Sequence, residues 1–185
     1  MTFVPLPRAF AARDTVEVAK ALLGQVLVHE VGGLVRAGRI VETEAYLGPH
    51  DLACHSSKGR TARTEVMFGA PGHAYVFLVY GMHHCVNVVT GGGAAVLLRA
   101  IEPVVGLPDD ARGDGPGRLT KLLGITRAHD GVRLDTRPLF LARGTPVTKV
   151  GTSARIGVEY AKAWAKKPLR FFEVSSAHVS GLRRR

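Results

Sequence analysis

The sequence predicts an α+β fold: a single domain over residues 1–185, with a mixed, mainly antiparallel sheet and a few helices. The chain has 185 residues, 46% of them hydrophobic, which is enough to bury one full core. Several short segments have the apolar pattern that is typical of strands. The 22 glycines and ten prolines indicate many turns and argue against a helical bundle.

Local patterns predict the individual elements. Asp14 is the expected N-cap of a first helix, with Glu17 three residues later as in a capping box and Gly24 as the stop. Gly32-Gly33 separates two strand-like segments and predicts a hairpin. In chain order we expect a helix at 14–23, strands at 25–31 and 35–45, a polar loop with a short helix at 49–63, strands at 74–79, 85–90 and 95–101, a helix at 119–123, a strand at 139–142, a helix at 159–165 and a strand at 170–174.

The charge of the chain is strongly basic and unevenly distributed. Its formal net charge is +10, and residues 155–185 contain eight Lys or Arg against Glu159 and Glu173. Such an excess favours a polyanionic partner, most simply nucleic acid, although solubility alone is an alternative explanation.

Cysteine content and hydropathy bear on location. Cys54 and Cys85 do not form a disulfide framework, which favours a reducing, cytoplasmic environment. No apolar run reaches the eighteen or so residues that span a membrane, and the N-terminus lacks a signal-peptide pattern. We therefore expect a cytoplasmic, nucleoid-associated protein if the source is bacterial.

The segment GRIVETEAY (38–46) carries the most informative polar pattern. Strand alternation places Glu42, Glu44 and Tyr46 on one face of an otherwise apolar strand. Because burying an unpaired charge is costly, at least one of these carboxylates needs a partner or a chemical role. This pattern alone leaves open the alternative that both line a solvated edge of the sheet.

Five blocks are long and distinctive: GRIVETEAYLGPHDLACHS, RTARTEVMFGAPGHAYVFLVYGMHHCVNVV, AVLLRAIEP, GPGRLTKLLGI and ARIGVEYAKAWAKKPLRFF. In these blocks and their order, which cover most of the chain, the sequence resembles the alkyladenine (3-methyladenine) DNA glycosylase family. The resemblance implies a curved antiparallel sheet with a protruding β-hairpin that enters the minor groove of DNA.

The resemblance also implies an activity. The chain is expected to be a monofunctional DNA glycosylase of base excision repair, which extrudes a damaged purine and hydrolyses its N-glycosidic bond to leave an abasic site. The implied substrates are 3-methyladenine, 7-methylguanine, hypoxanthine and ethenoadenine in double-stranded DNA. We expect a monomer that needs no cofactor and has no membrane partner.

Carried over position by position, the resemblance implies roles for eight residues. For the water, the resemblance implies Glu44 as general base, Arg99 as the partner that holds the attacking water, and the backbone carbonyl of Ile156 as a third contact. For the extruded base, it implies flanking roles for Tyr46, His55 and Phe77, and a role for Asn87 as the screen against the exocyclic amine of guanine. Tyr80 is implied as the side chain that fills the gap in the duplex. Phe77 stands where many members have tyrosine, so it keeps the stacking face and loses the hydroxyl.

Elementary physics supports two of these roles. Glu44 and Arg99 both lie in apolar strand segments, so pairing would neutralise both charges and favour the carboxylate form of Glu44. Tyr80 lies at a predicted hairpin tip, where an exposed aromatic ring is uncommon unless it contacts something. Stacking is worth about 1–3 kcal/mol per base, which is comparable with the cost of extrusion. A buried ion pair without chemistry, and a Tyr80 that folds onto the core, are the alternatives.

Basic residues are candidates for contacts with the DNA backbone. Gly115-Pro116-Gly117 precedes a helix and can present backbone amides to a phosphate, although an ordinary helix start explains it equally well. Trp164 is expected to pack in the core, and the three C-terminal arginines to act as a non-specific anchor. The expected backbone contacts are Met82, Arg118, Lys121, Lys166 and Lys167.

The sequence also bears on three other functions. The pairs Cys54-His55 and His84-Cys85 do not have the ligand spacing of structural zinc, so no metal site is expected. A non-catalytic nucleic-acid-binding protein would keep Glu44 as a structural residue. A glycoside hydrolase would use Glu42 and Glu44, although one strand face can hardly place both on opposite sides of a sugar ring. For Glu42 we expect a supporting or solvent-facing carboxylate.

Overall fold

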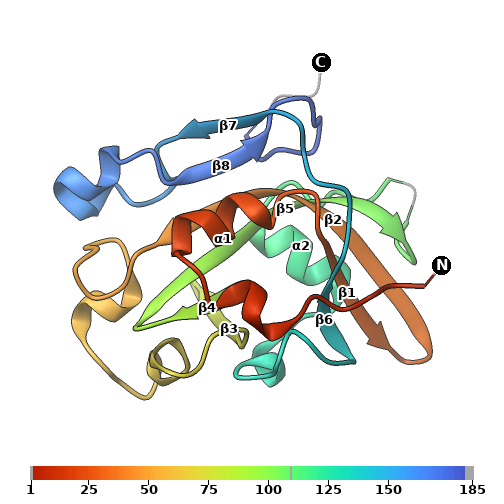
Figure 1. Cartoon of the computed structure of the whole chain (residues 1–185), viewed down its shortest axis with the longest axis horizontal. Coiled ribbons are helices and arrows are strands. Elements are labelled where there is room, and N and C mark those ends of the chain that lie inside the picture. Colours follow the sequence, from red (N-terminus) through yellow and green to blue (C-terminus); the bar gives the residue numbers. More distant parts are fainter. Residues whose placement is uncertain (1, 109, 182–185) are drawn as a thin grey trace.

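Eight antiparallel strands form a curved sheet in the computed structural model, which describes residues 2–108 and 110–181 (Figure 1). The strands are β1 (Val26–Val31), β2 (Leu34–Tyr46), β3 (Ala74–Val79), β4 (His83–Gly91), β5 (Ala94–Val105), β6 (Leu139–Ala142), β7 (Val150–Ser153) and β8 (Arg170–Glu173). Their order is β3-β4-β5-β2-β1-β6, while β8 pairs with β2 and β7 pairs with β8. The α+β class and the antiparallel sheet are confirmed.

Two α-helices cover the central strands. The helix α1 (Thr15–Ala21) packs on β2, β5 and β8, and α2 (Pro116–Leu123) packs on β4, β5 and β2. Leu22 and Leu123 are fully buried in the same apolar cluster as Leu98 of β5, so both helices share one core with the sheet. Short 3₁₀ helices complete the set: η1 (Arg8–Ala11), η2 (His55–Lys58), η3 (Glu65–Phe68), η4 (Arg127–His129) and η5 (Glu159–Lys166).

Several predicted elements are confirmed closely. The Asp14 side chain caps α1 by accepting hydrogen bonds from the amides of Val16 and Glu17. The β1–β2 hairpin turns at Gly32-Gly33, both in the left-handed region that glycine adopts easily. The helix α2 begins three residues earlier than predicted, because Pro116 is well suited to the first turn of a helix.

Two differences concern the C-terminal third. The strand β7 was not predicted, since the polar sequence VGTS carries no strand pattern and pairs with β8 alone. The predicted helix at 159–165 is two short 3₁₀ pieces, interrupted at Lys162, whose φ of 53° is incompatible with a continuous helix. Figure 1 shows this segment at one end of the blue β7–β8 pair.

The strand β2 lies at the centre of the sheet and is buried on both faces. Thr43 points to α1 and donates a hydrogen bond to the carbonyl of Ala19. Glu42 and Glu44 lie on the other face and are fully buried as well. The pairing with β5 is irregular between Ile40 and Thr43, and Arg99 of β5 has no direct Cα partner there. Such a bulge redirects side chains, and it lies where the two glutamates and Arg99 meet.

The β3–β4 hairpin forms as predicted and ends in an exposed turn. Tyr80 begins this turn, with a side chain that is 89% exposed and a positive φ of 52°. Its ring therefore does not fold onto the core. Insertion of the hairpin into DNA stays a prediction.

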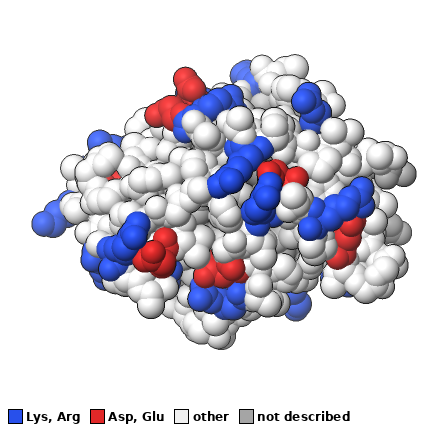
Figure 2. Space-filling model, turned by 60° about the horizontal axis from the view of Figure 1, so that its bottom comes forward, with Lys and Arg blue, Asp and Glu red and all other residues white. Residues whose placement is uncertain are grey.

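Charge is scattered over the surface. Figure 2 shows one face on which several basic side chains lie directly beside acidic ones. Ion pairs such as Arg133 with Asp135 place opposite charges side by side and leave the net excess of +10 unchanged. The three C-terminal arginines lie outside the described residues. Within the part of the chain that is described, no helix is long and apolar enough to cross a membrane.

Candidate active site

A cavity of about 450 Å³ opens between the β3–β4 hairpin, the loop after β2 and the segment before η5. This volume lies in the range of small-molecule pockets. It brings together seven of the eight residues to which the sequence assigned catalytic, base-binding or intercalating roles: Tyr46, His55, Phe77, Tyr80, Asn87, Arg99 and Ile156. Residues from five separate segments therefore converge on one concave site.

The eighth residue, Glu44, lies directly behind the cavity wall. Its carboxylate accepts hydrogen bonds from the Tyr46 hydroxyl at 2.8 Å and from the Ile156 amide at 2.8 Å. Nη1 of Arg99 lies 3.4 Å from Oε1 of Glu44. The predicted pair of Glu44 with Arg99 is thus present, and three residues of the cavity wall hold the carboxylate.

Glu42 is the closer partner of Arg99. Nε of Arg99 donates to Oε1 of Glu42 at 3.0 Å, and Arg170 donates to the same oxygen at 2.6 Å. Ser180 contributes its amide at 2.6 Å and its hydroxyl at 2.8 Å. Glu42 is therefore a buried supporting carboxylate. The solvent-facing alternative is wrong, because four donors and complete burial leave it no contact with water.

Burial raises the pKa of the Glu44 carboxyl above its ordinary value. The charge of Arg99 and the hydrogen bonds from Ile156 and Tyr46 oppose this rise without cancelling it. The sequence led us to expect that the charge of Arg99 would have the stronger effect on the pKa of Glu44. In the structure, burial has the stronger effect. Burial and the neighbouring Glu44 charge also hold the pKa of Tyr46 well above 10, which keeps this hydroxyl a hydrogen-bond donor.

A second buried ion pair lies next to Tyr46 and Ile156, behind the cavity wall. Arg155 and Asp51 are joined by two hydrogen bonds of 2.6 and 2.9 Å, and both side chains are fully buried. Arg155 also donates to the carbonyl of Ala45 at 2.8 Å and lies 4.6 Å from the centre of the Tyr46 ring. The pair fixes the residue directly before Ile156, and it leaves one face of Tyr46 for the cavity.

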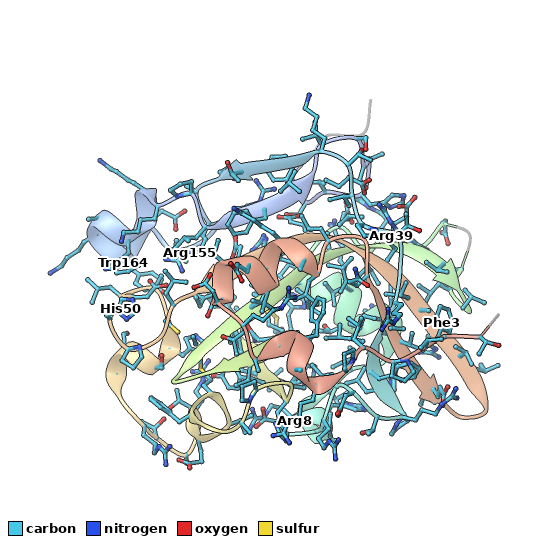
Figure 3. The ribbon with its side chains drawn as sticks, in the orientation of Figure 1. Phe3, Arg8, Arg39, His50, Arg155 and Trp164 are labelled. Atoms are coloured by element: carbon cyan, nitrogen blue, oxygen red, sulfur yellow. The ribbon has the colours of Figure 1, made fainter. Side chains whose placement is uncertain are left out.

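Arg155 lies among residues that are distant in the sequence (Figure 3). Arg155, Trp164 and His50 lie near one another at the end of the molecule that carries η5. The rings of His50 and Trp164 are 5.5 Å apart. Trp164 is half-buried and packs against the main core, as the sequence indicated.

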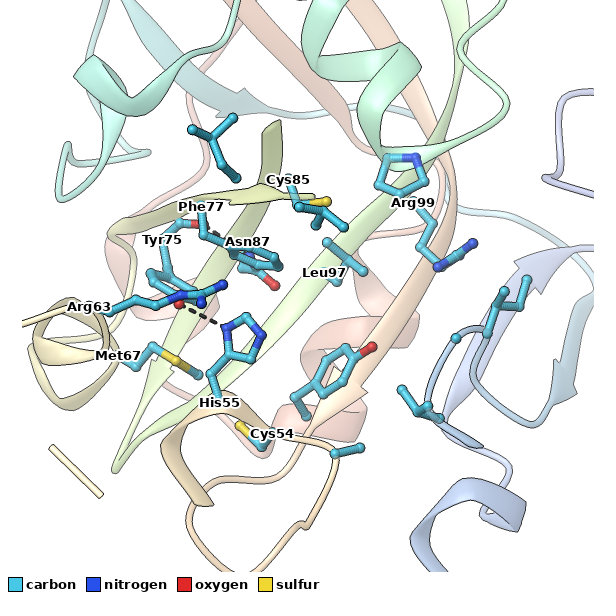
Figure 4. Close-up of a pocket in the computed structure, with 18 of the residues that line it drawn as sticks. Cys54, His55, Arg63, Met67, Tyr75, Phe77, Cys85, Asn87, Leu97 and Arg99 are labelled. Carbon is cyan, nitrogen blue, oxygen red and sulfur yellow. Dashed lines mark hydrogen bonds between the residues drawn. The ribbon is translucent and has the colours of Figure 1, made fainter. Parts of the chain in front are cut away.

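Three rings form an aromatic wall of the cavity (Figure 4). His55 packs edge-on against Phe77 at 4.5 Å, and Phe77 lies 5.3 Å from Tyr75. Nδ1 of His55 is 2.9 Å from the Tyr75 hydroxyl. Burial, followed by the charges of Arg63 and Lys58, lowers the pKa of His55 to about 4, so this imidazole is neutral at physiological pH.

Asn87 lies on the floor of the cavity. Its amide nitrogen donates to the backbone carbonyl of Tyr75 at 3.0 Å, which leaves its carbonyl oxygen without that constraint. The side chain is buried and fixed across the β3–β4 pair, which suits a rigid screening group.

Exposed apolar side chains form the rim. Tyr80, Ile156 and Tyr160 are all exposed and all line the cavity. Met82, the predicted backbone contact, is 70% exposed in the same hairpin turn as Tyr80. Clusters of exposed apolar groups beside a pocket are typical of interaction sites.

The other predicted backbone contacts lie away from the cavity. Arg118 is paired with Asp114 at 2.9 Å, and Lys121 is exposed on the same helix. Both line a separate open groove that also contains Arg36 and Arg112. Lys167 lies 3.5 Å over the Trp164 ring, and Lys166 is exposed beside it. None of these four basic residues lines the cavity.

Metal ligands do not cluster in the described residues, where no group of three His, Cys, Asp or Glu side chains is arranged to hold an ion. Both cysteines line the cavity, and burial raises the pKa of both thiols, that of Cys85 to about 11. Neither thiol is therefore a ready nucleophile at neutral pH.

Sequence patterns did not reveal several residues of the site. Arg155 directly precedes Ile156, yet its partner Asp51 lies 104 positions away. Ser180 reaches Glu42 from the last described segment. Arg63 and Tyr160 lie in two of the five distinctive sequence blocks, and only the fold shows that they line the cavity.

Comparison with known proteins gives consistent matches. A family model described as methylpurine-DNA glycosylase matches residues 9–177. A provisionally named 3-methyladenine DNA glycosylase of Myxococcus xanthus is 60% identical over 180 residues, 95% of this chain and 93% of the relative. Proteins given the same provisional name in Legionella pneumophila (strain Corby) and Anaeromyxobacter dehalogenans (strain 2CP-1) are 50% and 53% identical over 95% of this chain, and over 97% and 85% of their own lengths.

Proposed function

Since this chain belongs to the methylpurine-DNA glycosylase family, we propose that it excises damaged purines from double-stranded DNA with a water molecule activated by Glu44. Membership of the family makes it a hydrolase of N-glycosidic bonds. We further propose that its substrates are 3-methyladenine, 7-methylguanine, hypoxanthine and ethenoadenine. We also propose that it acts as a monomer, with residues 1–185 as one catalytic domain.

The hydrogen bonding of Glu44 carries this proposal. A carboxylate has about four acceptor positions. Glu44 accepts hydrogen bonds from Tyr46 and Ile156 and is ion-paired with Arg99. We assign an acceptor position that these contacts leave free to the attacking water, next to the cavity wall. The raised pKa of Glu44 strengthens it as a base once it is ionised.

The reaction then follows from the charges. The bond between the deoxyribose and the purine breaks with its electron pair moving to the purine, and the sugar becomes oxocarbenium-like. The Glu44 carboxylate stabilises this positive charge and accepts a proton from the water, whose oxygen bonds to the anomeric carbon. Arg99 orients Glu44 and stays charged, because two carboxylates outweigh the effect of its burial.

The cavity walls suit an extruded base. Tyr46 on one side and the rings of His55 and Phe77 on the other offer flat faces for a purine. Asn87 on the floor is proposed to clash with the exocyclic amine of guanine. Tyr80 is proposed to fill the vacated position in the duplex, where its exposed ring needs no rearrangement of the core.

A glycoside hydrolase that uses Glu42 and Glu44 is not supported. Glu42 is saturated by Arg99, Arg170 and Ser180 and does not line the cavity. A non-catalytic DNA-binding protein gives no reason for a buried carboxylate that three lining residues hold against the wall of a base-sized cavity. The two ideas differ in what they predict for Glu44→Gln.

Single-turnover release of purine from duplex DNA tests the proposal. Glu44→Gln keeps a carbonyl oxygen for Ile156 and Arg99, so the fold and DNA binding are expected to persist. The rate should fall by about 10²- to 10⁴-fold, the usual contribution of a general base. Glu102→Gln, a partly exposed carboxylate of β5 paired with Arg39, is the matched control and should keep the parental rate. A Glu44→Gln variant as fast as the parent would refute the assignment.

A further inference from the structure

Two cationic side chains line the cavity, and they differ in their partners. Arg99 is held between Glu42 and Glu44. Arg63, by contrast, has no carboxylate partner among the described residues and is exposed on the loop before η3. Figure 4 shows the two guanidinium groups on opposite sides of the labelled residues. The cavity thus contains a neutralised cation at one end and an unneutralised one at the other.

The surroundings of Arg63 fix the position of its charge. Its guanidinium carbon lies 5.4 Å from the centre of the Phe77 ring, a cation–π distance. Burial raises the pKa of Tyr75, and the guanidinium of Arg63 opposes that rise, so it lies close to this hydroxyl. His55 beside it is neutral. None of the carboxylates in the described part of the chain lines the cavity.

We propose that Arg63 is a specificity-determining residue, which favours neutral purines with a hydrogen-bond acceptor at the far edge of the ring over purines that alkylation has made cationic. This inference rests on the proposed function. Hypoxanthine and ethenoadenine belong to the favoured class, and 7-methylguanine and 3-methyladenine to the disfavoured class.

The chemistry of the leaving base gives the reason. When the glycosidic bond of a neutral purine breaks, the electron pair moves to the ring and negative charge develops there. A guanidinium at the ring edge stabilises that charge and donates hydrogen bonds to an oxygen or nitrogen acceptor. The purine anion then takes a proton from solvent, while the proton of the attacking water has gone to Glu44.

A cationic base changes in the opposite sense. Its positive charge is neutralised as the bond breaks, so no negative charge develops for Arg63 to stabilise. Before reaction, the base brings its charge towards an unpaired cation in a partly desolvated cavity, which is repulsive. Arg63 therefore helps one substrate class in the transition state and hinders the other in the bound state.

A contact with a DNA phosphate is the competing role for Arg63. It would position every substrate alike, because phosphate contacts carry no information about the base. The two roles therefore differ in the ratio of rates between substrate classes, and a general change in affinity does not separate them.

The test compares single-turnover rates on duplexes that carry one hypoxanthine or one 7-methylguanine. Arg63→Gln should lower the ratio of the hypoxanthine rate to the 7-methylguanine rate by about 10- to 100-fold, as expected for the loss of a charged hydrogen bond. Arg63→Lys should recover part of the ratio. Arg60→Gln is the matched control, since Arg60 is a neighbouring exposed arginine paired with Glu65 at 3.3 Å, and it should leave the ratio unchanged.

Each outcome has a distinct meaning. An unchanged ratio in Arg63→Gln, whether both rates fall equally or neither falls, overturns the inference. A parent that releases neither base overturns the proposed function. A thermal melt of each variant separates loss of folding from loss of discrimination, and the ratio itself is measured on the folded fraction.

Discussion

Replacing Tyr80 by glycine should separate folding from lesion binding, because the two respond to different properties of this residue. The Tyr80 backbone is in the left-handed region, with a φ of 52°, and its side chain is 89% exposed. A side chain in that backbone region is strained, and an exposed ring returns little burial energy. Such strain is often kept at functional sites.

The expected magnitudes follow from these two observations. Glycine removes about 1–2 kcal/mol of left-handed strain and returns about 0.5–1 kcal/mol through the greater freedom of the unfolded chain. The variant should therefore be as stable as the parent or up to about 1.5 kcal/mol more stable, an increase in Tm of at most about 6 °C for a chain of this size. Loss of base stacking should cost about 1–3 kcal/mol of lesion affinity, a Kd about 5- to 150-fold weaker.

Thermal unfolding and fluorescence titration with a lesion duplex measure the two quantities. Leu34→Ala is a suitable control, because Leu34 is an exposed apolar residue at the tip of the β1–β2 hairpin and does not line the cavity. It should leave lesion affinity unchanged. A Tyr80→Gly variant that binds lesions as tightly as the parent, or whose Tm falls by more than about 4 °C, would refute the reasoning.

Three further predictions concern buried charge. Arg155→Met leaves Asp51 without its cation, so we expect about 3–5 kcal/mol less stability in urea unfolding. Adding Asp51→Asn to this variant should recover part of the loss. Equal losses in the single and the double variant would contradict the pairing. Burial holds the folded pKa of Glu44 above 4.5. The parent should therefore lose stability relative to Glu44→Gln as pH rises from about 4.5 through that pKa. Thermal melts that show the opposite trend would contradict this prediction. The folded pKa of His55 is about 4, against an ordinary value of 6.5. The NMR signals of His55 should therefore titrate near pH 4, and the stability of the fold should fall as pH drops from 6.5 towards 4. A titration midpoint near 6.5 would rule this out.

Sequence periodicity was most informative where one strand face carries the chemistry. Alternation in GRIVETEAY correctly placed Glu42, Glu44 and Tyr46 together, because the side-chain period of a strand is fixed by backbone geometry. The Glu44–Arg99 pair was implied by the family resemblance, and the cost of burying either charge alone supported it. The same argument left the environment of Glu42 open, since its partners Arg170 and Ser180 come from segments whose position depends on the whole fold.

Contacts between distant segments lay beyond the local pattern. Arg155 reads as one more basic residue in a basic region, and only the folded chain brings it to Asp51. The bulge opposite Arg99 is likewise a property of two strands together. The segment 159–166 has a helical pattern, yet its Lys162 breaks the helix, and nothing in the local sequence indicates that break.

The central place of β2 has a consequence for the lifetime of the reactive geometry. This strand pairs with β1, β5 and β8 and is buried from Ile40 to Ala45. Amides in such a position exchange their hydrogens with solvent only when the whole domain unfolds, whereas turns exchange through brief local openings. Glu44 therefore cannot leave its position by fraying of β2, and the place of its backbone endures as long as the native state itself.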